Sequence, residues 1–83
     1  MPKRTRARRR HKAGRVRIPD VDIAAVRTRL EMSQQMFGDS FGIPPQTLRH
    51  WEQGLRRPDE AARAYLLVIS RMPDKVLKAL EAS

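Results

Sequence analysis

Residues 32–58 read MSQQMFGDSFGIPPQTLRHWEQGLRRP, two short segments divided by a glycine and a pair of prolines. The first segment follows Ser33, a residue type that caps helix N-termini well. Its Phe37 and Phe41 lie one helical turn apart, so both are expected to point into a core. The pattern predicts a helix that is capped by Ser33 and ends near Phe41, before a turn at Gly42.

The second segment has the features of another short helix. Pro44 and Pro45 suit a first helical turn, because the N–H group that proline lacks has no partner there. Leu48 and Trp51 are three residues apart and are predicted to be buried together. Gly54 is expected to stop the helix. Two short helices around a tight turn make a helix-turn-helix arrangement.

The chain on both sides of this stretch also has helical spacing. Helices are predicted from Asp20 or Asp22 to about Leu30, from an opening at Pro58-Asp59, and from an opening at Pro73-Asp74. Their expected apolar faces are Ile23, Val26 and Leu30; Ala62, Tyr65, Leu66 and Ile69; and Val76, Leu77 and Leu80. No run alternates with period two for long enough to predict a strand, so an all-α fold of five helices is expected.

The charge divides the chain into two parts. The net charge is +9, and residues 1–18 hold nine Lys or Arg residues and no acid, whereas residues 19–83 are formally neutral. We therefore expect a disordered basic tail at 1–18 and a folded domain at 19–83. The tail, with Arg8, Arg9 and Arg10 at its centre, is either a nucleic-acid arm or a solvated extension.

Several classes of protein are disfavoured. With no cysteine, a disulfide framework and a thiolate zinc site are excluded, which fits a reducing cytoplasm. The longest apolar run, at 65–69, is too short to span a bilayer, and no apolar stretch follows the charged N-terminus as in a secretory signal. No catalytic pattern and no metal cluster is visible, so we expect no enzyme, no cofactor and no metal site.

The helix-turn-helix geometry assigns roles to the outward side chains. The second of the two helices would enter the DNA major groove, where glutamine pairs with adenine, arginine with guanine, and threonine touches the thymine methyl. The candidate base-reading residues are Pro45, Gln46, Thr47, Arg49 and His50. The candidate phosphate-binding residues, at the start of the first helix and in the loop after the second, are Gln34, Arg56 and Arg57.

These residues carry a family resemblance. Residues 20–80 resemble the Xre (phage-repressor-like) helix-turn-helix family, whose fold is lambda-repressor-like. The matching residues are Ser33, Gln34, Phe37, Gly42, Ile43, Thr47, Leu48, Trp51, Glu52, Gly54, Arg57 and Pro58. The segment ARAYLLVISRMPDKVLKAL, at 62–80, is similar to the C-terminal end of HigA-type antitoxins. The resemblance implies a transcriptional repressor, and more narrowly an antitoxin that represses its own operon and neutralises a small RelE/HigB-like mRNA endonuclease.

Four positions depart from the family pattern. Pro44 replaces the usual Ser or Thr cap, and Pro45 stands where relatives often place a polar base-contacting residue. Glu31 stands at a left-handed position that favours glycine, and Gly38 replaces a helical alanine, at about 1 kcal/mol each. Together these departures predict modest stability for the monomer.

The expected partners follow from the size of the reading helix. One short helix covers few base pairs, so we expect a homodimer on a palindromic double-stranded operator. Candidate dimer residues are Val76, Leu77 and Leu80. A small basic toxin is a further expected partner, a membrane is not, and the expected location is the bacterial cytoplasm at the nucleoid. The alternatives are a free-standing repressor without a toxin, or a non-specific basic protein that binds nucleic acid through its tail.

Overall fold

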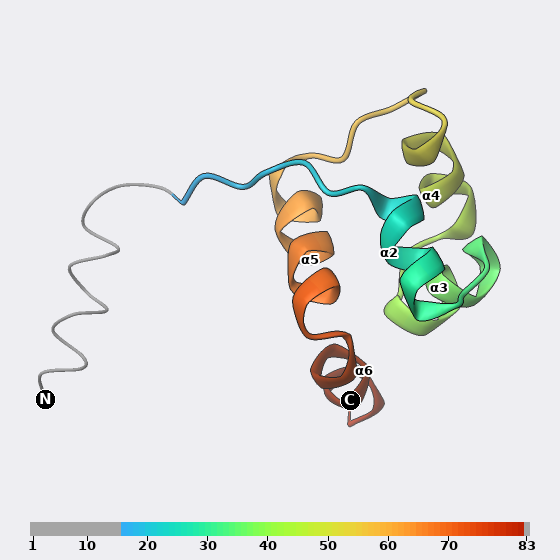
Figure 1. The fold of residues 1–83 in the computed structure, drawn as a ribbon, viewed down its shortest axis with the longest axis vertical. Coiled ribbons are helices and arrows are strands. Elements are labelled where there is room, and N and C mark those ends of the chain that lie inside the picture. Colours follow the sequence, from blue (N-terminus) through green and yellow to red (C-terminus); the bar gives the residue numbers. More distant parts are fainter. Residues whose placement is uncertain (1–15, 83) are drawn as a thin grey trace, which may run out of the picture.

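The computed structural model describes residues 16–82 of the chain, and within them it contains helices and no strand (Figure 1). The elements are α2 (Ile23–Leu30), α3 (Gln34–Phe41), α4 (Pro45–Glu52), α5 (Glu60–Arg71) and α6 (Pro73–Glu81). These confirm the predicted all-α fold of five helices. The tail residues Arg8, Arg9 and Arg10 lie outside the described residues, so their assignment to nucleic-acid contacts remains a prediction.

Three helices begin at capping side chains, as their sequences predict. Asp22, Ser33 and Asp59 each accept a hydrogen bond from the backbone N–H three residues further on, at 3.1, 3.0 and 2.8 Å. Of the two aspartates that could open the first helix, Asp22 is the cap. Asp20 lies outside the helix, in the extended segment that precedes it.

Helix α4 begins without a capping side chain. Pro44 makes no side-chain cap hydrogen bond, and Pro45 is the first helical residue. The helix ends at Glu52, and Gly54 follows in the left-handed conformation with φ of 77°. The N–H of Leu55 then donates to the carbonyl of His50 at 2.9 Å, which turns the chain out of the helix.

The core is built from side chains of all five helices, α2 to α6. Phe37 and Phe41 lie with ring centroids 4.8 Å apart, and the Tyr65 hydroxyl on α5 donates to the Phe41 carbonyl at 2.6 Å. The buried residues are Ile23, Val26, Phe37, Phe41, Ile43, Leu48, Leu66, Ile69 and Val76. A single shared core therefore fixes the orientation of α4 relative to the other helices.

The residues assigned to a dimer surface divide between core and surface. Val76 is only 9% exposed and belongs to the monomer core, and Leu77 packs against that core. Leu80 is 41% exposed. Of the three, Leu80 therefore offers the most surface to a second copy, and Val76 offers almost none because the monomer itself buries it.

The residue after α2, Glu31, has the left-handed backbone conformation expected at this position from the sequence. Glu31 has φ of 59° and ψ of 43°, and among the non-glycine residues of 16–82 it alone has a positive φ. A side chain in this conformation costs about 1–2 kcal/mol relative to glycine. This strain is one cost to the fold, and the modest stability of the monomer stays a prediction.

One ion pair braces α4 against the first two helices. The Arg27 guanidinium of α2 donates through Nε and Nη2 to the two carboxylate oxygens of Glu52, both at 2.8 Å. Its Nη1 donates to the Met32 carbonyl at 3.0 Å, and Gln34 of α3 donates to Glu52 at 3.1 Å. The side chains of Arg27 and Glu52 are only 19% and 10% exposed, so the pair is partly shielded from water.

The stability of the protein is expected to fall in acid because of this pair. The hydrogen bond from Arg27 lowers the pKa of Glu52, and the bond from Gln34 adds to the effect although burial opposes it. A folded-state pKa below the unfolded value of about 4.3 gives stability that is complete above that value and is lost as the pH falls through the folded pKa. Thermal melts between about pH 7 and pH 2 should therefore show a decline in melting temperature below about pH 5. In Glu52→Gln the decline should be shallower, and equal declines in both proteins would contradict this origin.

Candidate nucleic-acid interface

Most of the predicted base-reading residues lie on the accessible side of α4. Gln46 and Arg49 are exposed, and Thr47 and His50 are half-buried. Leu48, between them in the sequence, is fully buried and anchors the helix to the core. The amphipathic pattern therefore separates an inner anchoring residue from an outer polar face, as the spacing indicates.

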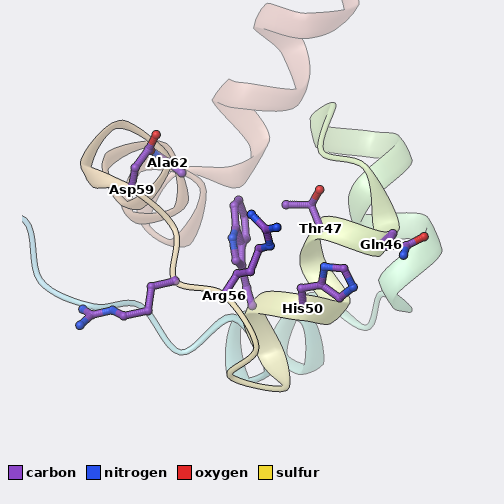
Figure 2. Close-up of a pocket in the computed structure, with 8 residues that line it drawn as sticks. Gln46, Thr47, His50, Arg56, Asp59 and Ala62 are labelled. Atoms are coloured by element: carbon purple, nitrogen blue, oxygen red, sulfur yellow. The ribbon is translucent and has the colours of Figure 1, made fainter.

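A hollow of about 420 Å³ lies beside this polar face (Figure 2). It is lined by Gln46, Thr47, His50, Trp51, Arg56, Arg57, Asp59 and Ala62. In Figure 2, Arg56 extends from the loop after α4 toward the same space as Thr47 and His50, and Asp59 and Ala62 form the far side. The structure thus brings three predicted base-reading residues and two predicted phosphate-binding arginines around one space.

Trp51 differs from the prediction that it is buried with Leu48. It packs against the core, yet it is half-buried and also lines the hollow. An i, i+3 spacing identifies the inward side of a helix but does not reveal how far a large ring reaches past its edge. The indole therefore both anchors α4 and forms part of the interface.

Pro45 and Arg49 lie outside the lining of the hollow. The Pro45 ring packs toward α3, where a Cβ atom added to Gly38 would lie 3.0 Å from its Cγ. Pro45 is half-buried by this arrangement, whereas Arg49 is exposed. Arg49 is thus the more accessible of the two for a base contact.

The three predicted phosphate-binding residues have different surroundings. Arg56 is exposed and lines the hollow. The Gln34 amide donates one hydrogen bond to Glu52, and an amide group has a second N–H and a carbonyl for other partners. Arg57 is paired through Nη2 with the Asp20 carboxylate at 3.1 Å, with side chains 75% and 77% exposed.

Sequence reasoning missed two charged residues at this interface. From the sequence, Asp20 is only a possible start of the first helix, and Arg63 has no assigned role. In the structure, Arg63 Nε lies 3.9 Å from the Asp20 Oδ1 atom that Arg57 also binds. The signal in the sequence is slight: Asp20 is the first acidic residue after the basic segment.

Other kinds of site are not formed in the described part of the chain. Residues 16–82 contain no group of three histidine, cysteine or carboxylate side chains that could hold a metal ion. No helix among those residues is long and apolar enough to cross a membrane.

Comparison with known proteins agrees with this geometry. The model of a family described as helix-turn-helix matches residues 23–62, which run from α2 into the start of α5. No curated protein matches the chain. A solved structure described as an HTH XRE-family like protein from Agrobacterium tumefaciens is 42% identical, with a TM-score of 0.69. The similarity covers 71% of this chain and 95% of that one. With this identity over nearly the whole length of the relative, the chain belongs to the XRE-like helix-turn-helix family.

Proposed function

We propose that the protein is a sequence-specific DNA-binding repressor that reads the major groove with α4. The observation that carries the proposal is the convergence of Gln46, Thr47 and His50 with Arg56 and Arg57 around one hollow. Polar side chains that pair with base edges and guanidiniums that bind phosphate are the two contact classes a DNA reader combines. Family membership supports the same function.

The geometry favours binding as a dimer. Helix α4 has eight residues and reaches only a few base pairs, so useful specificity requires two half-sites about 34 Å apart on a palindromic operator. Exposed apolar side chains at the α5–α6 end support a dimer surface there: Val68 is 44%, Met72 46% and Leu80 41% exposed. Sedimentation of the free protein at micromolar concentration tests for the dimer. Binding of the protein to duplex DNA as a monomer would contradict the proposal.

Gln46→Ala is expected to relax the sequence preference at one base pair of the operator. Loss of a bidentate amide–adenine pair should reduce discrimination there by about 1–3 kcal/mol. The measurement is selection of preferred sites from a randomised duplex pool, followed by titration of single-base variants of the selected site. Gln53→Ala is the matched control, because Gln53 is exposed at the end of α4 but does not line the hollow. An unchanged preference in Gln46→Ala would refute this role for Gln46.

A narrower proposal is that the repressor is the antitoxin of a toxin–antitoxin operon. It is supported by the sequence resemblance of residues 62–80, which form most of α5 and α6, to HigA-type antitoxins. A pulldown of the tagged protein from its native cells, with nuclease and high salt, tests it. Recovery of one small basic protein in near-equal amount supports an antitoxin with a toxin partner. Recovery of the bait alone supports a free-standing repressor.

The alternative, a non-specific nucleic-acid-binding protein that acts through its basic tail, is distinguished by the salt response. Binding through the tail alone would have equal affinity for all DNA sequences. The logarithm of that affinity would fall with the logarithm of the salt concentration, with a slope of about 0.9 per phosphate contacted. Reading by α4 adds a difference between sites that removal of residues 1–15 leaves in place.

A further inference from the structure

An acidic residue occupies the basic surface beside the reading helix. The extended segment of residues 16–22 passes the loop between α4 and α5, and there the Asp20 carboxylate pairs with Arg57 at 3.1 Å (Figure 1). Arg57 lines the same hollow as Gln46 and His50. Asp20 therefore lies at the edge of the candidate DNA surface, where its charge opposes that of a phosphate.

The guanidinium of Arg63 also faces the Asp20 carboxylate, and its Nε atom lacks a hydrogen-bond partner. Arg63 Nε lies 3.9 Å from Asp20 Oδ1, too far for a hydrogen bond, and this buried atom has no other hydrogen-bond partner. Arg63 Nη1 donates to the Pro58 carbonyl at 3.2 Å, which holds the guanidinium in place. Its side chain is 22% exposed, whereas that of Arg57 is 75% exposed. A largely buried arginine and a largely exposed one thus converge on one acidic oxygen.

We propose that Arg57 and Arg63 form a binding site for a DNA backbone phosphate, and that Asp20 occupies this site in the free protein as an autoinhibitory contact. The inference rests on the proposed DNA-binding function and adds Arg63 and Asp20 to it. On binding, a phosphodiester oxygen takes the place of Asp20 Oδ1 between the two guanidiniums. The exchange separates the Asp20 side chain from Arg57 of the α4–α5 loop, while Asp22 remains the cap of α2.

The charges and exposures explain why the exchange can occur. The Asp20–Arg57 pair is exposed on both sides, and exposed pairs contribute only about 0–1 kcal/mol, so little opposes their separation. A phosphate offers several acceptor oxygens, and guanidinium groups bind it in a bidentate manner that a single 3.1 Å contact does not match. Asp20 therefore weakens DNA binding modestly without preventing it.

The test compares Asp20→Asn with Glu81→Gln by titration of a fluorescent mixed-sequence duplex of about 20 base pairs at about 50 mM salt, where screening is weak. Both variants of the full chain raise the net charge by one, but Glu81 is at the end of α6 and exposed. Asp20→Asn should bind about two- to five-fold more tightly than Glu81→Gln, the factor that corresponds to one exposed ion pair. The same two variants are then made in an Arg57→Gln background, where the altered side chain is on the surface. There the ratio of their DNA affinities should fall toward one.

Each other outcome overturns the inference. Equal affinities of Asp20→Asn and Glu81→Gln would mean that only net charge matters. Weaker binding by Asp20→Asn would mean that Asp20 orients Arg57 for DNA instead of blocking it. If Asp20→Asn gains the same DNA affinity in the Arg57→Gln background, the gain does not come from the contact between Asp20 and Arg57. These results leave the proposed function standing, whereas absence of DNA binding by the unaltered protein and all variants would refute both.

Discussion

Glu52→Gln is expected to lower the free energy of unfolding by about 2–3 kcal/mol, although it changes neither the size nor the shape of the side chain. Arg27 and Gln34 direct three N–H donors at the two carboxylate oxygens of Glu52. An amide keeps one acceptor and turns the other position into a donor, so one guanidinium N–H faces an N–H. Removal of one charge from a shielded pair also leaves Arg27 without its counter-charge, which is costly because that side chain is only 19% exposed.

Urea denaturation of the unaltered protein and of Glu52→Gln at pH 7 measures this loss of stability. Glu81→Gln is the control for removal of a helical glutamate charge, since Glu81 is exposed, and it should change stability by less than about 0.5 kcal/mol. A loss in Glu52→Gln no larger than in the control would show that the network contributes nothing beyond surface charge. Because the pair joins α2 to α4, the same variant should also loosen the reading helix.

Gly38→Ala is expected to destabilise the protein by about 2 kcal/mol, although alanine is the better helix former. A Cβ atom at this position of α3 would lie 2.4 Å from the backbone carbonyl oxygen of Ile43 and 3.0 Å from the Pro45 ring. Overpacking against a backbone costs about 1–3 kcal/mol and can exceed that, whereas the gain in propensity is about 1 kcal/mol. Interpreted from sequence as a weakness in α3, Gly38 is instead required by the close approach of the turn.

Thermal and urea denaturation of Gly38→Ala provide the measurement, and the double variant Gly38→Ala, Pro45→Ala locates the clash. Because the Ile43 carbonyl is nearer than the ring, most of the loss should remain when the ring is removed. Full recovery in the double variant would assign the clash to Pro45 alone. A Gly38→Ala protein as stable as the original would show that α3 and α4 move apart at little cost.

These two positions explain how the reading helix is held. Gly38 lets the turn at Ile43 and the start of α4 lie directly against α3, and Glu52 ties the other end of α4 to α2 and α3. The eight-residue helix is too short to be stable in isolation, so these contacts and buried Leu48 must supply its stability. The polar face is therefore presented on a rigid support, as the proposed recognition of the major groove by α4 requires.

The sequence by itself determined the number of helices, the cap at Ser33, the helix starts near Asp22 and Asp59, and the division of α4 into an inner face at Leu48 and an outer polar face. These features depend on residues within one or two turns of each other, so local spacing predicts them.

Only the tertiary structure decided which distant groups meet. Asp20 lies 37 residues from Arg57 in the chain, and Arg27 lies 25 residues from Glu52. The half-exposure of Trp51, the burial of Val76 and the need for glycine at position 38 likewise depend on how the helices pack. Helical periodicity states which side of a helix faces inward, but only packing states what it meets there and how closely, because close-packed interiors allow one arrangement of neighbours.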